Sequence, residues 1–453
     1  MKICIIGCGL RTPLLIHGLA HSELSGTRLV LYDTAPGRAP LMTALGNGIA
    51  KGALHLESAD TLEEAIRDCS FVISCIRPGE MQARARDERL AVECGYAGQE
   101  TTGPAGFAMA LRTVPVALQH AKLVEKLAPG AWIVNFTNPA GLITQAISTY
   151  TRAAVVGICD TPAELFFRIS LALQQPLERV RCDYFGLNHL GWVAGVRVDN
   201  KDVSEPLLND DHRLRSLYPA NLFEPELIRR LRLIPTEYLY FYYNQRTAHA
   251  NQQRVGATRG QELVALNRSV FEELESRVGA GDTEAAIQAY RNYLNRRNAS
   301  YMHLEGAGTS AFSEPEVDWD PFAAATGYHR IAVDTIRALQ ASAPSQIVLN
   351  VANRGAIGDL AGDDVVEIPC LVDQSGPRAI ASRQLPAEVK GLVLAVKEYE
   401  RLTIEAAING GRKAATFALF QNPIVADWAI AEKYVDQLFS AAGTDKSLGS
   451  TSE

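Results

Sequence analysis

The fold is decided by the stretch "KICIIGCGLRTP", residues 2–13, together with "LVLYD", residues 29–33. The first is a short, β-branched apolar run that ends at Gly7 and Gly9, and the second is an apolar run that ends in an acid. The residues between them, 14–24, have the pattern of a helix. This order of strand, glycine turn, helix and strand is typical of a dinucleotide-binding unit, in which glycines let the backbone approach a pyrophosphate at a helix N-terminus.

Asp33, the acid that closes the second run, indicates which dinucleotide would bind. It lies near the distance from the glycines at which such units place the acceptor for a ribose 2′-hydroxyl. A carboxylate there repels a 2′-phosphate, so the sequence favours NAD over NADP. Thr12 replaces the third glycine of the GxGxxG pattern, so an ordinary tight turn between a strand and a helix is the alternative.

Three more apolar runs follow at the same rhythm, at 71–76, 131–136 and 153–158. Their alternation with helical patterns predicts an α/β fold with a Rossmann-type doubly wound parallel sheet. Ligands bind such sheets beyond the carboxyl ends of the strands, so the chemistry is expected at one rim. The residues expected at this rim are Gly7, Asp33, Arg77, Asn138 and Cys159.

The regular alternation ends near residue 180, and the rest of the chain mixes short apolar runs with helical patterns. A long helix is expected at 386–409. We expect an NAD-binding Rossmann domain at 1–180, an α+β domain for substrate, metal and oligomerisation at 181–440, and a disordered tail at 441–453.

The composition limits the possible partners. A net charge of −7 gives no reason to expect nucleic acid or an anionic membrane as a partner. No run approaches the ~18 apolar residues of a membrane span, and the N-terminus has no secretory pattern. The eight cysteines show no CxxC pair, which is typical of reduced thiols in the cytoplasm. We therefore expect a cytoplasmic protein.

Cys159 in "GICDTP" and His189 in "GLNHLGW" could share a metal ion. Thiolate and imidazole suit borderline divalent ions. Two protein ligands are too few for a closed structural zinc site, so substrate oxygens and water would complete the coordination. The alternatives are a small buried thiol and a packed core histidine.

Other polar residues have a functional and a structural reading. Glu100, in "GQETTGPAGF", could face a polyol or belong to the capped start of a helix. Arg84 and Arg259 could bind an anion with their planar guanidinium groups or form solvated salt bridges. Tyr238, in the aromatic run 238–243, could be a general base if a nearby positive charge lowers its pKa, or could pack in the core.

Together these stretches resemble glycoside hydrolase family 4, whose members are NAD- and divalent-metal-dependent glycosidases, and within it most resemble 6-phospho-β-glucosidases. The resemblance runs from residue 1 to about 430 in the order of the family. It is carried by the motifs "IIGCGLRTP", "RPG" with "ARDER", "GQETTGPAGF…ALRTVP", "VNFTNPAG", "GICDTP", "GLNHLGW", "IPTEYL…YY", "NVANRGAIGDL" and "VVEIPCLV".

The resemblance implies a role for each matching residue. Cys159 and His189 would hold a divalent ion, typically Mn2+, and Tyr238 would be the base. Arg84 and Arg259 would bind the 6-phosphate of the sugar. The implied substrate-binding residues are Arg84, Glu100, Asn138, Asn188 and Arg259. The implied cofactor-binding residues are Gly7, Gly9, Arg11, Thr12, Asp33, Arg77, Pro78 and Asn138.

The implied activity is hydrolysis of phosphorylated β-glucosides such as cellobiose 6-phosphate. In this chemistry NAD+ takes hydride from C3 of the sugar, which makes the C2 proton acidic. The metal stabilises the developing enolate, Tyr238 removes the proton, and the C1–O bond breaks by elimination. Water then adds and the hydride returns to C3. The family commonly forms dimers or tetramers, so a homodimer or homotetramer is expected.

Three alternatives stay open. Asp160 directly follows the metal cysteine, and enzymes of the family that cleave α-linkages often carry an acid there as proton donor, so a 6-phospho-α-glucosidase is the first alternative. The second is an NAD-dependent 2-hydroxy-acid dehydrogenase of the lactate or malate type, which shares the N-terminal fold and would accumulate NADH. The third is a sensor that binds NAD without turnover.

Overall fold

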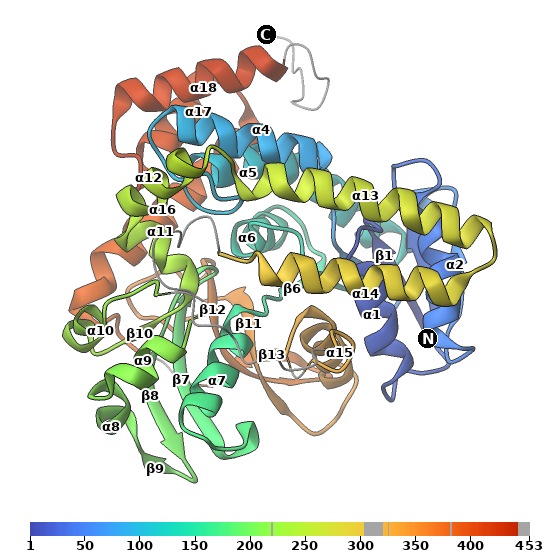
Figure 1. The fold of residues 1–453 in the computed structure, drawn as a ribbon, viewed down its shortest axis with the longest axis horizontal. Coiled ribbons are helices and arrows are strands. Elements are labelled where there is room, and N and C mark those ends of the chain that lie inside the picture. The colour runs from blue at the N-terminus through green and yellow to red at the C-terminus, as the bar shows by residue number, and fades with distance from the viewer. Residues whose placement is uncertain (219–220, 303–319, 325, 381–382, 443–453) are drawn as a thin grey trace.

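The structure is a computed structural model that describes residues 1–218, 221–302, 320–324, 326–380 and 383–442 (Figure 1). A nine-stranded sheet forms its centre, in the order β13-β12-β11-β6-β5-β4-β1-β2-β3. The strands are β1 (Lys2–Ile6), β2 (Arg28–Tyr32), β3 (His55–Ser58), β4 (Phe71–Ser74), β5 (Trp132–Asn135), β6 (Ala154–Gly157), β11 (Ser345–Ala352), β12 (Val365–Asp373) and β13 (Gly376–Ala379).

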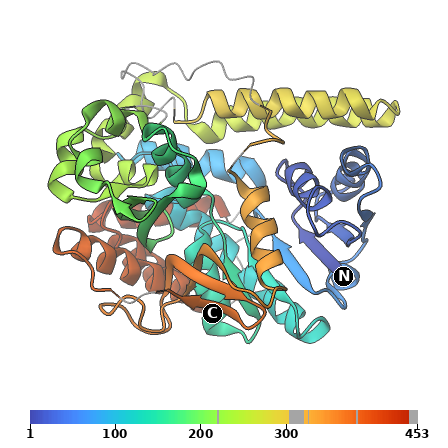
Figure 2. The ribbon, with the colours of Figure 1, turned by 90° about the horizontal axis from the view of Figure 1, so that it is seen from below.

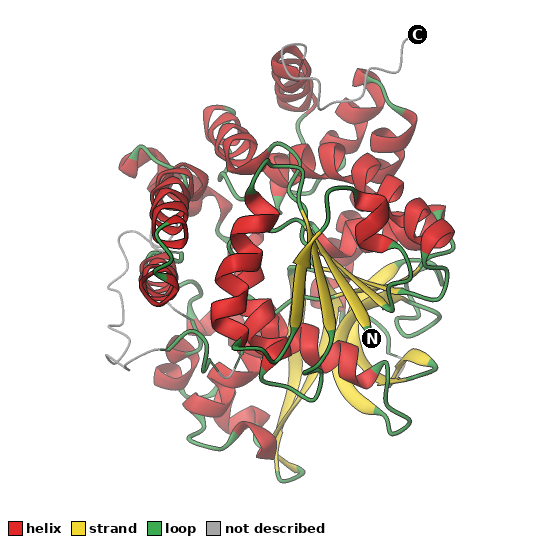
Figure 3. Ribbon diagram, turned by 90° about the vertical axis from the view of Figure 1, so that its right-hand side faces the viewer, coloured by secondary structure: helices red, strands yellow, loops and turns green. Residues whose placement is uncertain are grey.

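The first six strands are parallel, which confirms the predicted doubly wound sheet. Alternate residues of β1 enter two different apolar cores. Ile3 and Ile5 pack into one core, whereas Cys4 and Ile6 pack into the other. Because successive side chains of a strand point to opposite faces, both faces of the sheet are covered by helices. Figure 3 shows the yellow strands between the red helices.

The helices of this half are α1 (Thr12–Ala20), α2 (Arg38–Ala50), α3 (Leu62–Ile66), α4 (Glu80–Glu93), α5 (Gly103–Leu127), α6 (Ala140–Tyr150) and α7 (Thr161–Ala172). Those of the second half are α8 (Ser204–Leu208), α9 (Asp211–Ser216), α10 (Pro225–Leu231), α11 (Tyr240–Tyr243), α12 (Gln245–Val255), α13 (Arg259–Gly279), α14 (Thr283–Ala299), α15 (Tyr328–Ala338), α16 (Ala387–Asn409), α17 (Arg412–Phe420) and α18 (Trp428–Ala442). No helix in the described ranges is long and apolar enough to cross a membrane.

The second half contributes to the central sheet and also builds a smaller one. β11 pairs antiparallel with β6 through Asn350 and Gly157, and β12 and β13 continue the sheet outward. The smaller sheet contains β7 (Val180–Leu187), β8 (Leu190–Val198), β9 (Lys201–Asp202) and β10 (Ile234–Pro235). β7 and β8 flank His189, which occupies the turn between them with a φ of 61°.

The long helices agree with the sequence. α16 begins and ends within a residue of the predicted range, and the stretch 222–300 is largely helical. α13 and α14 form an antiparallel pair that lies along one side of the molecule (Figures 1 and 2). A capping box fixes the start of α13, because Thr258 accepts from the Gln261 backbone N–H and Gln261 accepts from the Thr258 N–H. Of the predicted tail, 441–453, residues 441 and 442 end helix α18, and the others lie outside the described residues.

Candidate active site at the rim of the sheet

A cavity of about 2220 Å3 opens at the carboxyl ends of the parallel strands and extends between the two halves of the chain. Most of the predicted site residues line it, although they come from distant parts of the sequence. They are Gly7, Gly9, Arg11, Asp33, Arg77, Pro78, Arg84, Glu100, Asn138, Asp160, Tyr238 and Arg259. Four predicted residues are not part of its lining: Thr12, Cys159, Asn188 and His189.

The glycine loop after β1 can only be built with glycine at its first position. Gly7 has a φ of +90°, and a Cβ on it would lie 2.6 Å from the carbonyl oxygen of Cys75. The Asp33 carboxylate accepts from the backbone N–H of Cys8 at 2.6 Å and of Ala35 at 2.8 Å. It therefore ties the loop to the end of β2 while lining the cavity. Thr12 is buried at the start of α1.

Cys159 and His189 lie side by side, although they come from two different elements of the chain. Cys159 follows β6, His189 sits in the β7–β8 turn, and Cys159 Sγ lies 3.5 Å from His189 Nε2. Both side chains are buried, with 3% of each exposed. Two ligands of a tetrahedral zinc ion, at its usual bond lengths to sulfur and nitrogen, would lie about 3.5 Å apart. The separation therefore fits a shared divalent metal.

The hydrogen bonds of His189 leave the right nitrogen available for a metal. The Thr101 hydroxyl donates to Gln99 Oε1 at 2.8 Å, so it accepts from His189 Nδ1, which is 2.8 Å away. The proton therefore sits on Nδ1, and the lone pair of Nε2 faces Cys159. Burial lowers the pKa of His189 to about 3, which keeps the ring neutral. Burial, and after it the charge of Glu367, raises the pKa of the Cys159 thiol.

Within the described ranges, no three His, Cys, Asp or Glu side chains gather in a way that could hold a metal. Cys159 and His189 would thus supply two ligands, and substrate or water the others. The Tyr238 ring stacks on the His189 ring, with centroids 3.7 Å apart and planes at 4°. Burial, followed by the charge of Glu100, raises the pKa of Tyr238 well above its usual value. Tyr238 could become a base only when a cation approaches it.

Arginines surround a single carboxylate on another wall of the cavity. Glu100 lies 2.8 Å from Arg77 and 2.8 Å from Arg84. Burial opposes its charge, but Arg84, Arg77 and Arg11 outweigh burial and hold the pKa of Glu100 well below its usual range. This wall, together with Arg259, concentrates positive charge where an anionic group of a ligand could bind.

Glu88 connects the two helices that carry Arg84 and Arg259. Its carboxylate is fully buried. It accepts a hydrogen bond from Arg84 Nε at 2.7 Å and another from the Gly260 N–H at 2.6 Å. Arg259 itself donates to the Arg297 carbonyl oxygen at 2.5 Å and to Glu262 at 3.1 Å. Arg84 is therefore buried and paired, which excludes the solvated helix face considered above.

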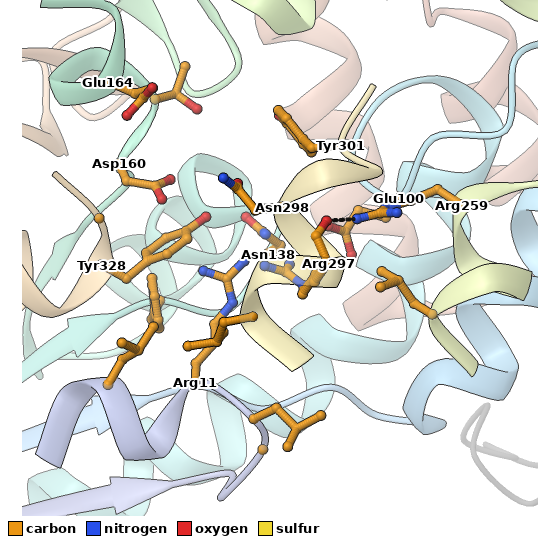
Figure 4. A pocket seen from close by; sticks show the side chains of 18 of the residues that line it. Arg11, Glu100, Asn138, Asp160, Glu164, Arg259, Arg297, Asn298, Tyr301 and Tyr328 are labelled. Carbon is orange, nitrogen blue, oxygen red and sulfur yellow. Dashed lines mark hydrogen bonds between the residues drawn. The ribbon is translucent and has the colours of Figure 1, made fainter. Parts of the chain in front are cut away.

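Several residues of the cavity were missed by sequence reasoning. Figure 4 shows Arg297, Asn298 and Tyr301, from the end of α14, beside Arg11, Asn138 and Glu100. The Arg11 guanidinium lies 3.7 Å from the centre of the Tyr328 ring, and Figure 4 shows Asp160 near Tyr328. The run "NRRNASY" has no periodicity or spacing that would separate it from an ordinary basic helix end.

Asn188 points away from the cavity. Its Nδ2 donates to Glu367 Oε1 at 3.0 Å, and its Oδ1 accepts from the Gly141 N–H at 3.4 Å. A Cβ on Gly141 would lie 2.9 Å from the Asn188 Cβ, so the two segments are in close contact. In this arrangement Asn188 supports the turn that carries His189.

Known proteins match this chain along nearly its whole length. The model described as "Family 4 glycosyl hydrolase" matches residues 2–173, and "Family 4 glycosyl hydrolase C-terminal domain" matches 184–425. A probable 6-phospho-beta-glucosidase of Bacillus subtilis (strain 168) is 30% identical over 97% of this chain and 96% of its own length. The phospho-alpha-glucosidase PagL of Clostridium acetobutylicum is 26% identical, over 97% of each chain.

A solved structure has the same fold. The 6-phospho-beta glucosidase from Thermotoga maritima, with manganese, NAD+ and glucose-6-phosphate, superposes with a TM-score of 0.82 at 28% identity and covers 98% of both chains. Both halves of this chain therefore match one family, in the order in which the family carries them, and the chain belongs to glycosyl hydrolase family 4.

Proposed function

We propose that this protein is a 6-phospho-β-glucosidase that uses NAD and a divalent metal, Mn2+ or another ion of similar preference. The observation that carries the proposal is the Cys159–His189 pair, which lies under Tyr238 at the rim of a dinucleotide-binding sheet. The relatives named above support the phosphorylated β-glucoside as substrate, and the structure from Thermotoga maritima supports both cofactors.

When bound, NAD+ and the metal supply reversible hydride removal at C3 of the sugar and polarisation of its O2 and O3. The protein contributes the sites for them. Gly7 and Gly9 would let the loop approach the pyrophosphate, and Asp33 would accept from a ribose hydroxyl. Arg11, Arg77, Pro78 and Asn138 complete the proposed cofactor site, and Thr12 supports it from the start of α1.

Tyr238 is the proposed base that removes the C2 proton. Its ring is fixed against His189, so its hydroxyl moves little relative to the proposed metal ligands. A divalent cation held by Cys159 and His189 would stabilise the phenolate, which offsets the burial that otherwise raises the pKa of Tyr238. Elimination at C1 then follows, and the same group would return the proton when water adds.

Arg84 and Arg259 are the proposed ligands of the sugar 6-phosphate. Arg84 is held by Glu88 and Glu100, and Arg259 by Glu262 and the Arg297 carbonyl. Guanidinium groups fixed in this way are suited to bind a phosphate with little loss of conformational freedom. Glu100 and Asn138 would contact the sugar hydroxyls, and Asn188 would act from behind, through the turn of His189.

Asp160 is the reason to keep the α-anomer as a second candidate. It lines the cavity near Tyr328, whose ring lies on Arg11 (Figure 4). Phosphorylated α-glucosides would need such an acid beside the leaving group, and PagL shows that α-enzymes are among the relatives. The dehydrogenase alternative has less support, because it would need a His–Asp pair for its chemistry, whereas His189 bonds Thr101 and faces Cys159.

The test is release of p-nitrophenol from three substrates: the β-glucoside 6-phosphate, its α-anomer and the unphosphorylated β-glucoside. Each is measured with NAD+ and Mn2+ under reducing conditions and again with either one omitted. We expect cleavage of the phosphorylated β-substrate alone, lost without either cofactor. Cleavage of the α-anomer would make Asp160 the proton donor. Net NADH formation on a hydroxy acid, with no cleavage, would refute the proposal.

We also propose that the protein works in the cytoplasm as a homodimer or homotetramer. The many thiols without disulfides and the acidic net charge support the first point. The long helix α16, on which Leu394 is partly exposed, could take part in a subunit interface. Light scattering on the purified protein would give the subunit count, and a monomer at micromolar concentration would contradict the second point.

A further inference from the structure

One buried carboxylate joins the two segments that carry the proposed metal ligands. Oε1 of Glu367, on β12, accepts from Nδ2 of Asn188 at 3.0 Å and from Nδ2 of Asn350 at 2.9 Å. Asn188 directly precedes His189. Asn350 pairs across the sheet with Gly157, just before Cys159. A single oxygen atom therefore connects the turn of His189 to the strand end of Cys159.

These connections have no room to shift. Glu367 is 1% exposed and Asn350 is fully buried. The second oxygen, Oε2, accepts from the Tyr184 hydroxyl at 2.6 Å. A Cβ on Gly157 would lie 2.8 Å from the Asn350 Cβ, so that asparagine is pressed against the strand. A side chain held this tightly transmits its position to whatever its partners support.

The Glu367 carboxylate lacks a counter-ion among the described residues. Its three hydrogen-bond donors, Asn188, Asn350 and Tyr184, are all neutral. In the part of the chain that the structure describes, no lysine or arginine forms an ion pair with it. A buried carboxylate without an opposite charge is costly. A divalent cation between Cys159 and His189 would supply that charge, since Glu367 bonds the neighbour of His189 and, through Asn350, lies beside the strand end that carries Cys159.

We infer that Glu367 is a positioning residue of the metal site, which sets the spacing of Cys159 and His189 through Asn188 and Asn350 and balances the charge of the bound ion. The inference rests on the metal site proposed above. It assigns Glu367 to a layer behind the ligands, where groups that orient ligands and tune the charge of a site are found. Glu367 does not line the cavity, so its expected effect is on the metal.

The test is the variant Glu367→Gln in the full-length protein. The amide keeps the shape of the side chain and an oxygen for the two asparagines, but it removes the charge. We expect the Kd for Mn2+ to rise about 10-fold to 100-fold, the usual effect of losing an outer carboxylate. Free Mn2+ is counted by electron paramagnetic resonance with NAD+ present. The Kd for NAD+, from fluorescence quenching, should not change.

A second readout separates this role from a merely structural one. Without metal, the Tm of Glu367→Gln should equal or exceed that of the wild type, because a neutral amide needs no counter-charge. The matched control is Glu400→Gln, which also removes a buried carboxylate. Glu400 pairs with Lys397 at 2.5 Å, and neither lines the cavity. This control should lose Tm because it leaves a buried ammonium unpaired, yet keep its affinity for Mn2+.

A second variant, Tyr184→Phe, tests the same inference if Glu367→Gln does not fold. It removes one donor from Glu367 and keeps the carboxylate, and we expect a weaker but measurable loss of Mn2+ affinity. The inference about Glu367 would be overturned if the Kd for Mn2+ were unchanged in Glu367→Gln and Tyr184→Phe, or if the metal-free Tm fell with an unchanged Kd. The proposed metal site would not be affected by either result. If the wild type binds no Mn2+, or Cys159→Ser binds it equally well, the proposed metal site fails and the inference fails with it.

Discussion

Replacing Gly7 by alanine should damage the dinucleotide loop more than the same change at another left-handed glycine. The φ of +90° at Gly7 costs a non-glycine residue about 1–2 kcal/mol. The new Cβ would also lie 2.6 Å from the backbone oxygen of Cys75, which cannot rotate away. Overpacking of this kind adds about 1–3 kcal/mol. The total is roughly 2–5 kcal/mol, and the loop must shift toward the proposed pyrophosphate site.

Gly26→Ala is the matched control, because Gly26 has a φ of +81° and no atom within 4 Å of a Cβ. It should lose only the conformational part, about 1–2 kcal/mol. Urea unfolding of both variants gives the difference in stability, and an NAD+ titration gives the difference in affinity. We expect Gly7→Ala alone to weaken NAD+ binding. Equal destabilisation of the two variants, with NAD+ affinity unchanged in both, would refute the argument that the loop is built around this contact.

Three further predictions concern the site. Tyr238→Phe should lower kcat about 10²–10⁴-fold while NAD+ still binds, because a general base is lost. Exchange of the C2 proton of the sugar with D2O, measured by NMR, should also stop. Continued exchange would assign the base to another residue. Arg84→Gln should lower kcat/KM for phosphorylated substrates about 10–100-fold, because a charge-assisted hydrogen bond to the phosphate is lost. Cleavage of any unphosphorylated analogue should not change. An equal loss of kcat/KM on phosphorylated and unphosphorylated substrates would argue against phosphate binding by Arg84. Burial raises the pKa of Glu237 from 4.5 to about 7, so the folded state holds this proton more tightly than the unfolded state does. Its contribution to stability is therefore greatest below pH 4.5, falls between about pH 4.5 and pH 7, and is lost above pH 7. Glu237→Gln should flatten this fall, and an unchanged pH profile would contradict the assignment.

The parallel part of the sheet could be predicted because its signals are local. Five of the six parallel strands are apolar runs followed by a helix, whereas the sixth, β3, has the partly exposed sequence HLES and was not predicted. The rim residues followed from the same logic, since parallel strands end at one edge. β11 and β12 have equally clear strand character, but nothing in their sequence says that β11 pairs with β6, because that pairing joins segments far apart in the chain.

The parts of the site that escaped prediction have the same cause. Arg297 and Tyr328 line the cavity because α14 and α15 pack against the Rossmann half, not because of any pattern around them. Glu367 lies in the motif "VVEIPCLV", but no pattern in the sequence indicated a role for it. Asn188 was assigned to the substrate through a family motif, and its orientation depends on Glu367, a partner that no spacing rule identifies.

The pairing of β11 with β6 also bears on how the chain is made. During synthesis β6 leaves the ribosome long before β11, and at about 5–20 residues per second the interval is on the order of 10–40 s. Throughout this time β6 is an unprotected edge that could pair with a neighbouring nascent chain. Its length of four residues limits that risk. Because Asn350 and Glu367, which support the turn of His189, are made late, the proposed metal site is complete only after most of the polypeptide has emerged.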